Sequence, residues 1–425
     1  MKILAIETSC DDTGIAIIEA EGAKTPVFKV LSNIVSSQQI HANYGGIFPM
    51  MAKREHQTNL VPVLTQSLKE SRLLKTVLSS LRGGAPRGAR RRGNLEVIKR
   101  ILEKENTLFE SVKEFLETHQ KPDIDAIAIT HGPGLEPCLW VGVNFAKALS
   151  CAWDIPVIPV NHIEAHILVN FLPKIKENPK SQILNPKQLF PAVSLVVSGG
   201  HTQLILVKKI GDYKIIGETR DDAAGECFDK CARILNLGYP GGPIISKIAS
   251  EQLLIRENKQ LVNKIQLPRP MINSKDYDFS FSGLKTAVLY TVRDKQKGRP
   301  TDRSMGLNKE FIQEMCAEIQ DAVCDVLIKK TLQAAKDFKA KTIILGGGVS
   351  ANQELRKQFK LRIKNNESRV NFLVPPKELS TDNGLMIAVA GYFNRAKKIA
   401  PPSHKASGGA AWQKLSVDAN LRIGR

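Results

Sequence analysis

Paired cysteines, long hydrophobic runs and a surplus of acidic side chains are all absent from this sequence of 425 residues. Its seven cysteines are scattered without a Cys-x-x-Cys pair, which argues against a disulfide framework or a structural zinc site and favours a reducing compartment. No stretch approaches the roughly 18 apolar residues of a membrane span, and the apolar run after Met1 is too short for a signal peptide. We therefore expect a soluble, cytoplasmic protein.

The charge balance is strongly basic. Lys and Arg number 61 against 42 Asp and Glu, which gives a formal net charge of +19 and an isoelectric point near 9.6. This surplus would attract a polyanion such as nucleic acid, and the alternative is that it serves solubility alone. The length exceeds what one hydrophobic core usually organises, so we predict two lobes, at residues 1–160 and 161–425.

Short β-rich runs recur along the chain with helical patterns between them, which predicts an α/β fold in which helices cover a sheet. The first two runs, KILAIE at 2–7 and GIAIIE at 14–19, flank a polar tip at 8–13 that is a candidate phosphate cradle. The sequence shows no internal repeat. The later predicted strands cover residues 124–130, 155–159, 192–198, 202–208 and 342–345.

One stretch departs from this alternation. Residues 72–121 contain a run from Arg82 to Arg92 that mixes Arg with Gly, Ala and Pro, so we predict an exposed basic insertion without apolar periodicity. Two interpretations are open, a flexible arm that contacts RNA or a solvated loop. A second polar connection, at 173–187, is expected to be a surface loop.

Two histidines lie at helical spacing directly after a predicted strand. In the sequence NHIEAH, His162 and His166 share one face of an apolar helix, so both imidazoles can reach one metal ion, unless they are unrelated surface residues. Zinc proteases need Glu directly after the first His, whereas Ile163 holds that place and Glu164 points to another face. The pattern therefore indicates a divalent metal without a hydrolytic glutamate.

Glycine-rich turns follow several strands. The segment VVSGGHTQ, which begins at Val196, joins two strands through a turn whose backbone N–H groups could approach an anion, although such a turn is more often an ordinary hairpin. Downstream, Asp229 lies where it could hold a ribose hydroxyl, and Gly242 permits close backbone approach. Two polar tips of this kind, one in each half, are expected of two lobes that enclose a nucleotide.

The segment GGGVSAN, at 346–352, lies between a strand and a helix, where α/β proteins commonly bind ligands. It lacks the Lys-Ser/Thr pair of a Walker A loop and the spacing of a dinucleotide fingerprint. The cluster STDNG then precedes a last apolar helix, predicted to begin near Met386. Asp382 in this cluster is either part of a helix cap or a third, oxygen-donating metal ligand.

Eight blocks follow one another along the chain: ETSCDDTGIAI, NHIEAH, VSGGHTQL, DDAAGECFDK, YPGGP, FSFSGLKTA, GGGVSAN and STDNGLMIA. Taken in this order, they resemble the TsaD family, the tRNA N6-adenosine threonylcarbamoyltransferases, and the NHxExH form is similar to the bacterial and organellar branch. The resemblance covers nearly the whole chain outside 72–121 and implies a two-lobed actin/hsp70-like fold built from duplicated ribonuclease H-like halves.

The resemblance also implies a reaction. A threonylcarbamoyl group would pass from threonylcarbamoyl-AMP to the N6 amine of the tRNA adenosine just 3′ of the anticodon, with a TsaB-like protein and a TsaE-like ATPase as partners. One divalent metal ion, iron or zinc, would be held by His162, His166 and Asp382. The threonylcarbamoyl-AMP would be bound by Val196, Val197, Ser198, Gly199, Gly200, Asp229, Gly242 and Asn352.

Two positions near the N-terminus add to this interpretation. Asp11, at the first hairpin tip, is our candidate for orienting or deprotonating the adenosine amine. Where the family usually has Pro-Glu-x-Ala-x-Arg-x-His, this chain has Met50 in place of the Glu, which leaves the effect of losing that carboxylate open.

Three other functions compete with this one. A metal-dependent peptidase would explain the histidine pair but neither the missing glutamate nor the glycine turns. A catalytically inert scaffold is opposed by the intact metal-binding pattern. A sugar or acetate kinase of the same fold class would consume ATP and release a phosphorylated product.

Overall fold

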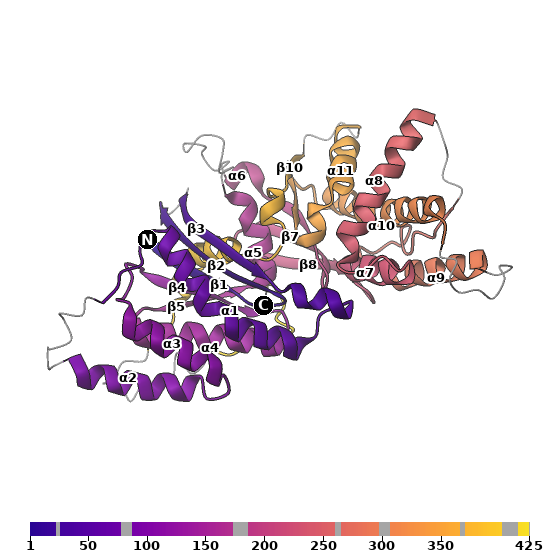
Figure 1. Cartoon of the computed structure of the whole chain (residues 1–425). Helices are drawn as coiled ribbons and strands as arrows, with labels where there is room; N and C mark the ends of the chain where they lie inside the picture. Colours follow the sequence, from indigo (N-terminus) through magenta and orange to yellow (C-terminus); the bar gives the residue numbers. More distant parts are fainter. Residues whose placement is uncertain are drawn as a thin grey trace.

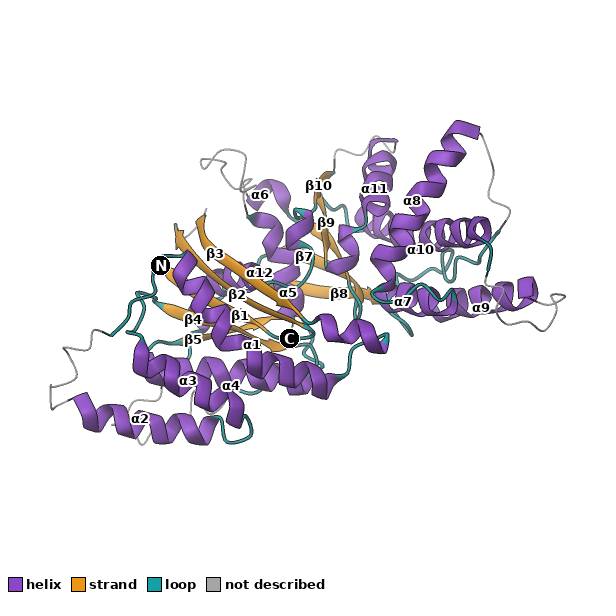
Figure 2. Cartoon of the chain, in the orientation of Figure 1, coloured by secondary structure: helices purple, strands orange, loops and turns teal. Residues whose placement is uncertain are grey.

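The computed structural model describes residues 1–22, 26–77, 87–172, 186–259, 265–296, 307–365, 370–401 and 415–424. These residues form an α/β structure with two separate sheets (Figure 2). Among them, no helix combines the length and the apolar composition needed to cross a membrane.

The two five-stranded sheets have the same topology. In each, the first strand pairs antiparallel with the second and the second with the third, while the fourth strand lies parallel to the first on its other side and the fifth lies beyond it. The first sheet comprises β1 (Lys2–Glu7), β2 (Asp12–Glu21), β3 (Val27–Ser37), β4 (Ala126–Gly132) and β5 (Val157–Asn161). The second comprises β6 (Ala192–Val197), β7 (Thr202–Lys209), β8 (Asp212–Glu218), β9 (Thr342–Gly346) and β10 (Asn371–Leu373).

Helices cover both faces of this pair of sheets (Figure 1). The outer face of the first sheet is covered by α1 (Pro49–Glu70) and α4 (Glu136–Trp153); α3 (Asn106–Thr118) packs against α1, and α2 (Arg87–Ile101) packs against α4. Between the sheets lie α5 (His162–Leu168) and α12 (Gly384–Phe393). The second sheet is associated with α6 (Pro186–Leu189), α7 (Ala224–Ile234), α8 (Gly241–Lys259), α9 (Ser282–Gln296), α10 (Lys309–Asp337) and α11 (Gln353–Asn365). Short 3₁₀ helices are η1 (Gln39–Tyr44), η3 (Val169–Phe171), η4 (Gly348–Ala351), η5 (Lys377–Leu379) and η6 (Arg395–Lys397).

The buried side chains follow from strand alternation. Ile3 and Ala5 of β1 pack into the core between the sheets, whereas Leu4 and Ile6 pack against the outer helices. Because both faces are covered, the strand reads as a continuous apolar run. This architecture confirms the predicted two-lobed α/β fold.

The central helix α12 is apolar on every side, as expected of a helix buried between two layers. Its first residue, Gly384, contacts β2 at Gly14, so both segments carry glycine at the point of contact. A Cβ atom on Gly14 would lie 2.7 Å from the backbone N of Gly384, and one on Gly384 would lie 2.5 Å from the backbone N of Ala16. This close approach fixes the turn before α12 beside the first hairpin. The helix begins two residues before Met386, near the predicted start, because Asn383 of the predicted capping cluster caps it and Gly384 is its first residue.

Two expectations about organisation need correction. The exposed, unpatterned insertion predicted at 72–121 is wrong for its described part, because α3 buries Leu108, Val112 and Phe115 against the outer helices, and Ile98 and Leu102 are buried too. The neighbouring basic run hid this helical spacing. Residues 78–86 and 173–185 lie outside the described residues, so the arm and loop interpretations stay predictions.

The division into lobes at residue 160 also stays a prediction. All strands of the first sheet precede residue 162, and all strands of the second follow it. However, α12, from the C-terminal part, contacts β1 and β2 of the first sheet. The chain therefore returns to the first half after completing the second.

Candidate metal centre

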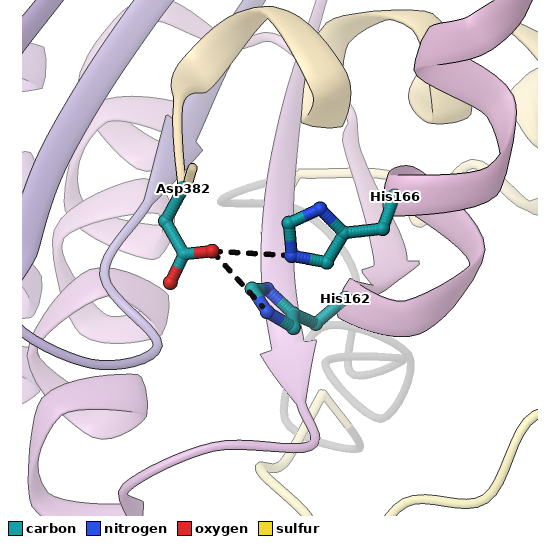
Figure 3. A group of neighbouring side chains, drawn as sticks. All are labelled: His162, His166 and Asp382. Carbon is teal, nitrogen blue, oxygen red and sulfur yellow. Dashed lines mark hydrogen bonds and ion pairs between the residues drawn. The ribbon is translucent and has the colours of Figure 1, made fainter. Parts of the chain in front are cut away.

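Two histidines and one aspartate converge between the sheets (Figure 3). Asn161 ends β5 and caps α5, with its side-chain oxygen accepting from the backbone N of Ile163 at 2.9 Å. The helix therefore begins at His162, which puts His166 one turn later on the same face. Asp382 reaches them from the turn before α12, and its Oδ1 lies 3.1 Å from His166 Nε2 and 3.6 Å from His162 Nε2.

The three donor atoms suit one divalent cation. They lie within 4.8 Å of one another, and both histidines are buried. Two imidazoles and one carboxylate form a donor set that non-haem iron(II) and zinc both accept, with positions left open for a substrate. This convergence agrees with the predicted ligand set of His162, His166 and Asp382.

His162 is also held from behind. Its Nδ1 lies 3.2 Å from Ser9 Oγ and 3.3 Å from Glu7 Oε2, so its Nε2 remains directed at Asp382. The Glu7 carboxylate is itself fixed, because it accepts from the backbone N of Ser9 at 2.5 Å and from Thr130 Oγ1 at 2.6 Å. His166 Nδ1 has no such hydrogen-bond partner among the described residues. A carboxylate behind a ligating histidine fixes the ring orientation and raises its basicity.

The charges around the site favour a cation. Burial alone would lower the pKa of His162, but the carboxylates of Asp382 and Glu7 raise it above its ordinary value. Burial alone would raise the pKa of Asp382, but the two imidazoles hold it below its usual range. At His166 burial dominates and lowers the pKa. The pocket thus stabilises positive charge between its carboxylates.

Glu164, the acid on the same helix, faces away from these ligands. The hydroxyl of Tyr213 donates to its Oε1 at 2.9 Å and the amide of Asn394 to its Oε2 at 2.8 Å. Both carboxylate oxygens are therefore engaged in the core between the sheets. Glu164 is therefore not placed to activate a metal-bound water as the glutamate of a zinc protease does, which opposes the peptidase alternative.

The first hairpin tip lies beside this centre. Burial, and next the nearby Asp382 carboxylate, raise the pKa of Asp11. The tip is held from α1, because His56 contacts the Cys10 carbonyl through Nε2 at 2.9 Å and Thr13 Oγ1 through Nδ1 at 2.8 Å. Burial lowers the pKa of His56 to about 4, so it makes these contacts as a neutral ring. The structure thus places Asp11 near the candidate metal ligands on a fixed support.

The second hairpin tip contains the predicted residues Val196 to Gly200. Val196 and Val197 are buried in β6, and the turn closes through Ser198, whose backbone N donates to the His201 carbonyl at 2.8 Å. A Cβ atom on Gly199 or Gly200 would meet nothing within 4 Å. The backbone of the two glycines therefore borders open space, which leaves it accessible to a ligand.

Asp229 and Gly242 meet at the start of α8. Asp229 Oδ1 accepts from the backbone N of Gly241 at 2.7 Å, so this carboxylate caps the helix. A Cβ atom on Gly242 would lie 3.9 Å from Phe228, so packing within the chain does not demand a glycine there. A role of Asp229 in holding a ribose stays a prediction, and one of its oxygens already has a structural partner.

The third glycine turn serves packing in this structure. A Cβ atom on Gly346 would lie 2.6 Å from the carbonyl of His166, and one on Gly347 would overlap the carbonyl of Val197. Gly347 also has a φ of +83°, which favours glycine. Asn352 caps α11 by accepting from Leu355 at 2.9 Å and donates to Gln320 at 2.9 Å. Its contact with substrate stays a prediction. Both the oxygen and the nitrogen of its side-chain amide already have partners within the chain.

Sequence analysis missed the residues that support the centre. Glu7, Ser9 and His56 hold His162 and the first hairpin tip, and none was identified from its pattern. A signal was available for Glu7, because it is an acid at the end of an otherwise apolar strand. A buried carboxylate requires hydrogen-bond partners, so such a residue marks a candidate functional position.

Together, the fold and the site define a two-lobed α/β protein with a cluster of two histidines and one aspartate, which could hold one metal ion, between its two sheets of the same topology. The chain belongs to the TsaD family, described as tRNA N6-adenosine threonylcarbamoyltransferase, whose family model matches residues 29–80 and 103–389. The gap between the two matched stretches, residues 81–102, is narrower than the predicted insertion and contains the basic run and all of α2.

Individual relatives match nearly the full length. A protein of Sulfurihydrogenibium sp. is 41% identical over 92% of this chain and 90% of its own length, and one of Porphyromonas gingivalis is 38% identical over 92% of both. A Cytophaga hutchinsonii protein is 35% identical over 100% of this chain and 97% of its own length. All three are named tRNA N6-adenosine threonylcarbamoyltransferase.

Proposed function

We propose that this chain transfers the threonylcarbamoyl group of threonylcarbamoyl-AMP to the N6 amine of the adenosine just 3′ of the anticodon, in tRNAs that read codons beginning with adenine. Membership of the family makes the chain a transferase that modifies tRNA adenosine. The observation that carries the finer proposal is the convergence of His162, His166 and Asp382 beside the Asp11 tip. One side of the centre offers metal ligands and the other a carboxylate suited to proton transfer.

The reaction requires one bond to form and one to break. The amine nitrogen forms a bond with the carbamoyl carbon, the bond from that carbon to the phosphate oxygen breaks, and AMP leaves with the electron pair. Asp11 would orient the amine and accept the proton it loses. The open backbone at Gly199 and Gly200 supports placing the adenylate there, with Val196, Val197, Ser198, Asp229, Gly242 and Asn352 as the other proposed substrate-binding residues.

One divalent metal ion, iron or zinc, completes the proposed site, held by His162, His166 and Asp382. When bound, it would act as a Lewis acid that polarises the carbonyl under attack. Glu7 and Ser9 keep the His162 ring oriented, so the ligand is in place before the ion arrives. Burial of both histidines limits competition from water.

The proposed setting is a cytoplasmic assembly. The tRNA follows from the family, and a TsaB-like protein and a TsaE-like ATPase are proposed partners. The seven cysteines are all unpaired, in keeping with a reducing compartment.

The function is tested by incubating the purified protein with threonylcarbamoyl-AMP, a tRNA that reads codons beginning with adenine, and the proposed partners. Mass spectrometry of the digested tRNA should detect threonylcarbamoyladenosine, with AMP formed in equal amount. No product with either metal and with the partners bound would contradict the proposal. Consumption of ATP with a phosphorylated product would favour a kinase instead.

Replacing Glu7 with glutamine should weaken metal binding by about 10- to 100-fold. The substitution keeps the size of the side chain but removes the charge behind His162 Nδ1, so the ring becomes a weaker and less oriented ligand. Metal affinity is measured by competition with a chelating dye. The matched control is Glu164→Gln, which alters a second buried carboxylate of the same core that does not face the ligands. Equal metal affinity in wild type and Glu7→Gln would refute this role.

A further inference from the structure

Apolar side chains gather on the surface at residues 44–50. Among the described residues, seven large hydrophobic side chains are exposed, and three of them lie here: Tyr44 at 55%, Phe48 at 49% and Met50 at 60%. The rings of Tyr44 and Phe48 contact edge to face, with centroids 5.4 Å apart. We call these three side chains the aromatic rim. Exposed apolar side chains that cluster in this way mark an interaction site more often than single ones do.

The segment that carries the aromatic rim contacts both sides of the proposed transfer site. The chain enters this segment from β3, whose last residue, Ser37, pairs with Asp12, and the backbone N of Gln38 donates to the carbonyl of Asp11 at 3.2 Å. On the other side, the Arg233 guanidinium donates to the carbonyl of Gly45. Arg233 belongs to α7, the helix that carries Asp229 (Figure 1). Residues 38–45 therefore contact both the Asp11 tip, from the first half of the chain, and α7, from the second half.

The rim is rigidly supported. Tyr44 ends η1, whose His41 is buried and bonds Gln38, and Phe48 directly precedes Pro49, the first residue of α1. Fixed aromatic rings bind with little loss of conformational entropy. The exposed side chain of Met50 makes the surface more apolar still.

We propose that Tyr44 and Phe48 form a stacking platform for an unpaired nucleobase that neighbours the target adenosine in the anticodon loop. The proposal rests on the proposed function. An adenosine that reacts at its amine must leave the base stack, so its neighbours lose a stacking partner. Exposed aromatic faces beside the site replace that partner without selecting a particular base.

Size and charge favour RNA over a protein as the occupant. A stable protein interface buries about 800 Å² on each partner. The three side chains of the aromatic rim lie within seven residues and offer one ring pair, a small surface that suits one or two bases. The exposed side chain of Arg54 follows one turn after Met50, and the whole chain carries a formal charge of +19. These charges suit the phosphates on either side of a stacked base.

The test uses the intact protein with its partner proteins and an anticodon stem-loop RNA. The fluorescent base 2-aminopurine replaces the nucleotide next to the target adenosine, and stacking is read from its quenching on binding. The double variant Tyr44→Ala with Phe48→Ala should bind the RNA about tenfold more weakly or worse and lose the quenching. Tyr44→Phe with Phe48→Tyr should retain both. The matched control is Tyr290→Ala, which removes a ring of 57% exposure on α9.

Each other outcome is decisive. Unchanged RNA affinity and quenching in the double variant would overturn the platform, as would a wild-type assembly that does not bind the RNA. Loss of partner-protein association with RNA binding intact would assign the aromatic rim to a protein interface instead. Failure of the proposed function would appear separately, as wild-type protein that binds RNA but forms no threonylcarbamoyladenosine.

Discussion

Replacing His162 with alanine should abolish metal binding and threonylcarbamoyl transfer together. The variant keeps His166 and Asp382, but one histidine and one carboxylate are too few ligands for tight binding of iron or zinc. The loss of affinity should exceed the roughly 10- to 100-fold that follows removal of an outer partner such as Glu7. Glu7 would also be left buried without the imidazole that it contacts, which adds a structural cost.

Metal content by elemental analysis and product by mass spectrometry give two independent measurements on this variant. The matched control is His119→Ala, which removes a histidine at the end of α3, on the outer side of the first sheet, and should change neither. Thermal unfolding shows whether the His162 variant is folded. A folded variant with full metal content and full activity would refute the centre. Full metal content without activity would instead assign His162 a role in binding the substrate.

The three proposed metal ligands show how much residue spacing alone can predict. The spacing of His162 and His166 was enough to predict that they share a helical face, because both lie in one short helix after a strand. Asp382 follows His166 by 216 residues, so local pattern left it between a helix cap and a ligand. In the structure Asn383 accepts from the backbone N of Met386 and caps α12, while Asp382 faces the histidines, so its role as a metal ligand stays a prediction that this geometry supports.

The glycine turns show where pattern misleads. All three were candidate ligand-binding turns because glycine permits close approach, although the Ser-Gly-Gly turn was also compatible with an ordinary hairpin. Close approach has two causes. Gly199 and Gly200 border open space, whereas Gly346 and Gly347 are needed by the backbone of neighbouring elements. The sequence cannot distinguish these cases, because the atoms that fill the space come from distant segments.

The shared topology of the two sheets could not be predicted from the sequence either. The chain shows no sequence repeat, yet both sheets have an antiparallel meander of three strands followed by two parallel ones. The missed strands β3, β8 and β10 occupy the outer positions, where mixed exposure weakens the apolar signal. Central strands, buried on both faces, were all predicted. Backbone pairing thus preserves a symmetry that side chains have lost.

Asp11→Asn should reduce transfer by about 10²- to 10⁴-fold while leaving metal content unchanged. The asparagine side chain has nearly the same size and can still accept a hydrogen bond from the amine, but it cannot take up the proton. Since His56 and Gln38 hold the tip through backbone carbonyls and a threonine hydroxyl, its conformation should survive the substitution.

The pH profile distinguishes a base from a merely structural residue. A general base acts when deprotonated, so the wild-type rate under single turnover should rise with pH through the pKa of Asp11 and then level off. Burial, and then the Asp382 carboxylate, raise that pKa, so the rise lies at higher pH than for an exposed aspartate. In Asp11→Asn this limb should vanish along with the rate, and Asp11→Glu should restore part of both. An unchanged rate would remove Asp11 from the mechanism, and a reduced rate with the same limb would make it a positioning residue whose neighbour, Asp12, with a pKa raised by burial to about 7, is the next candidate base.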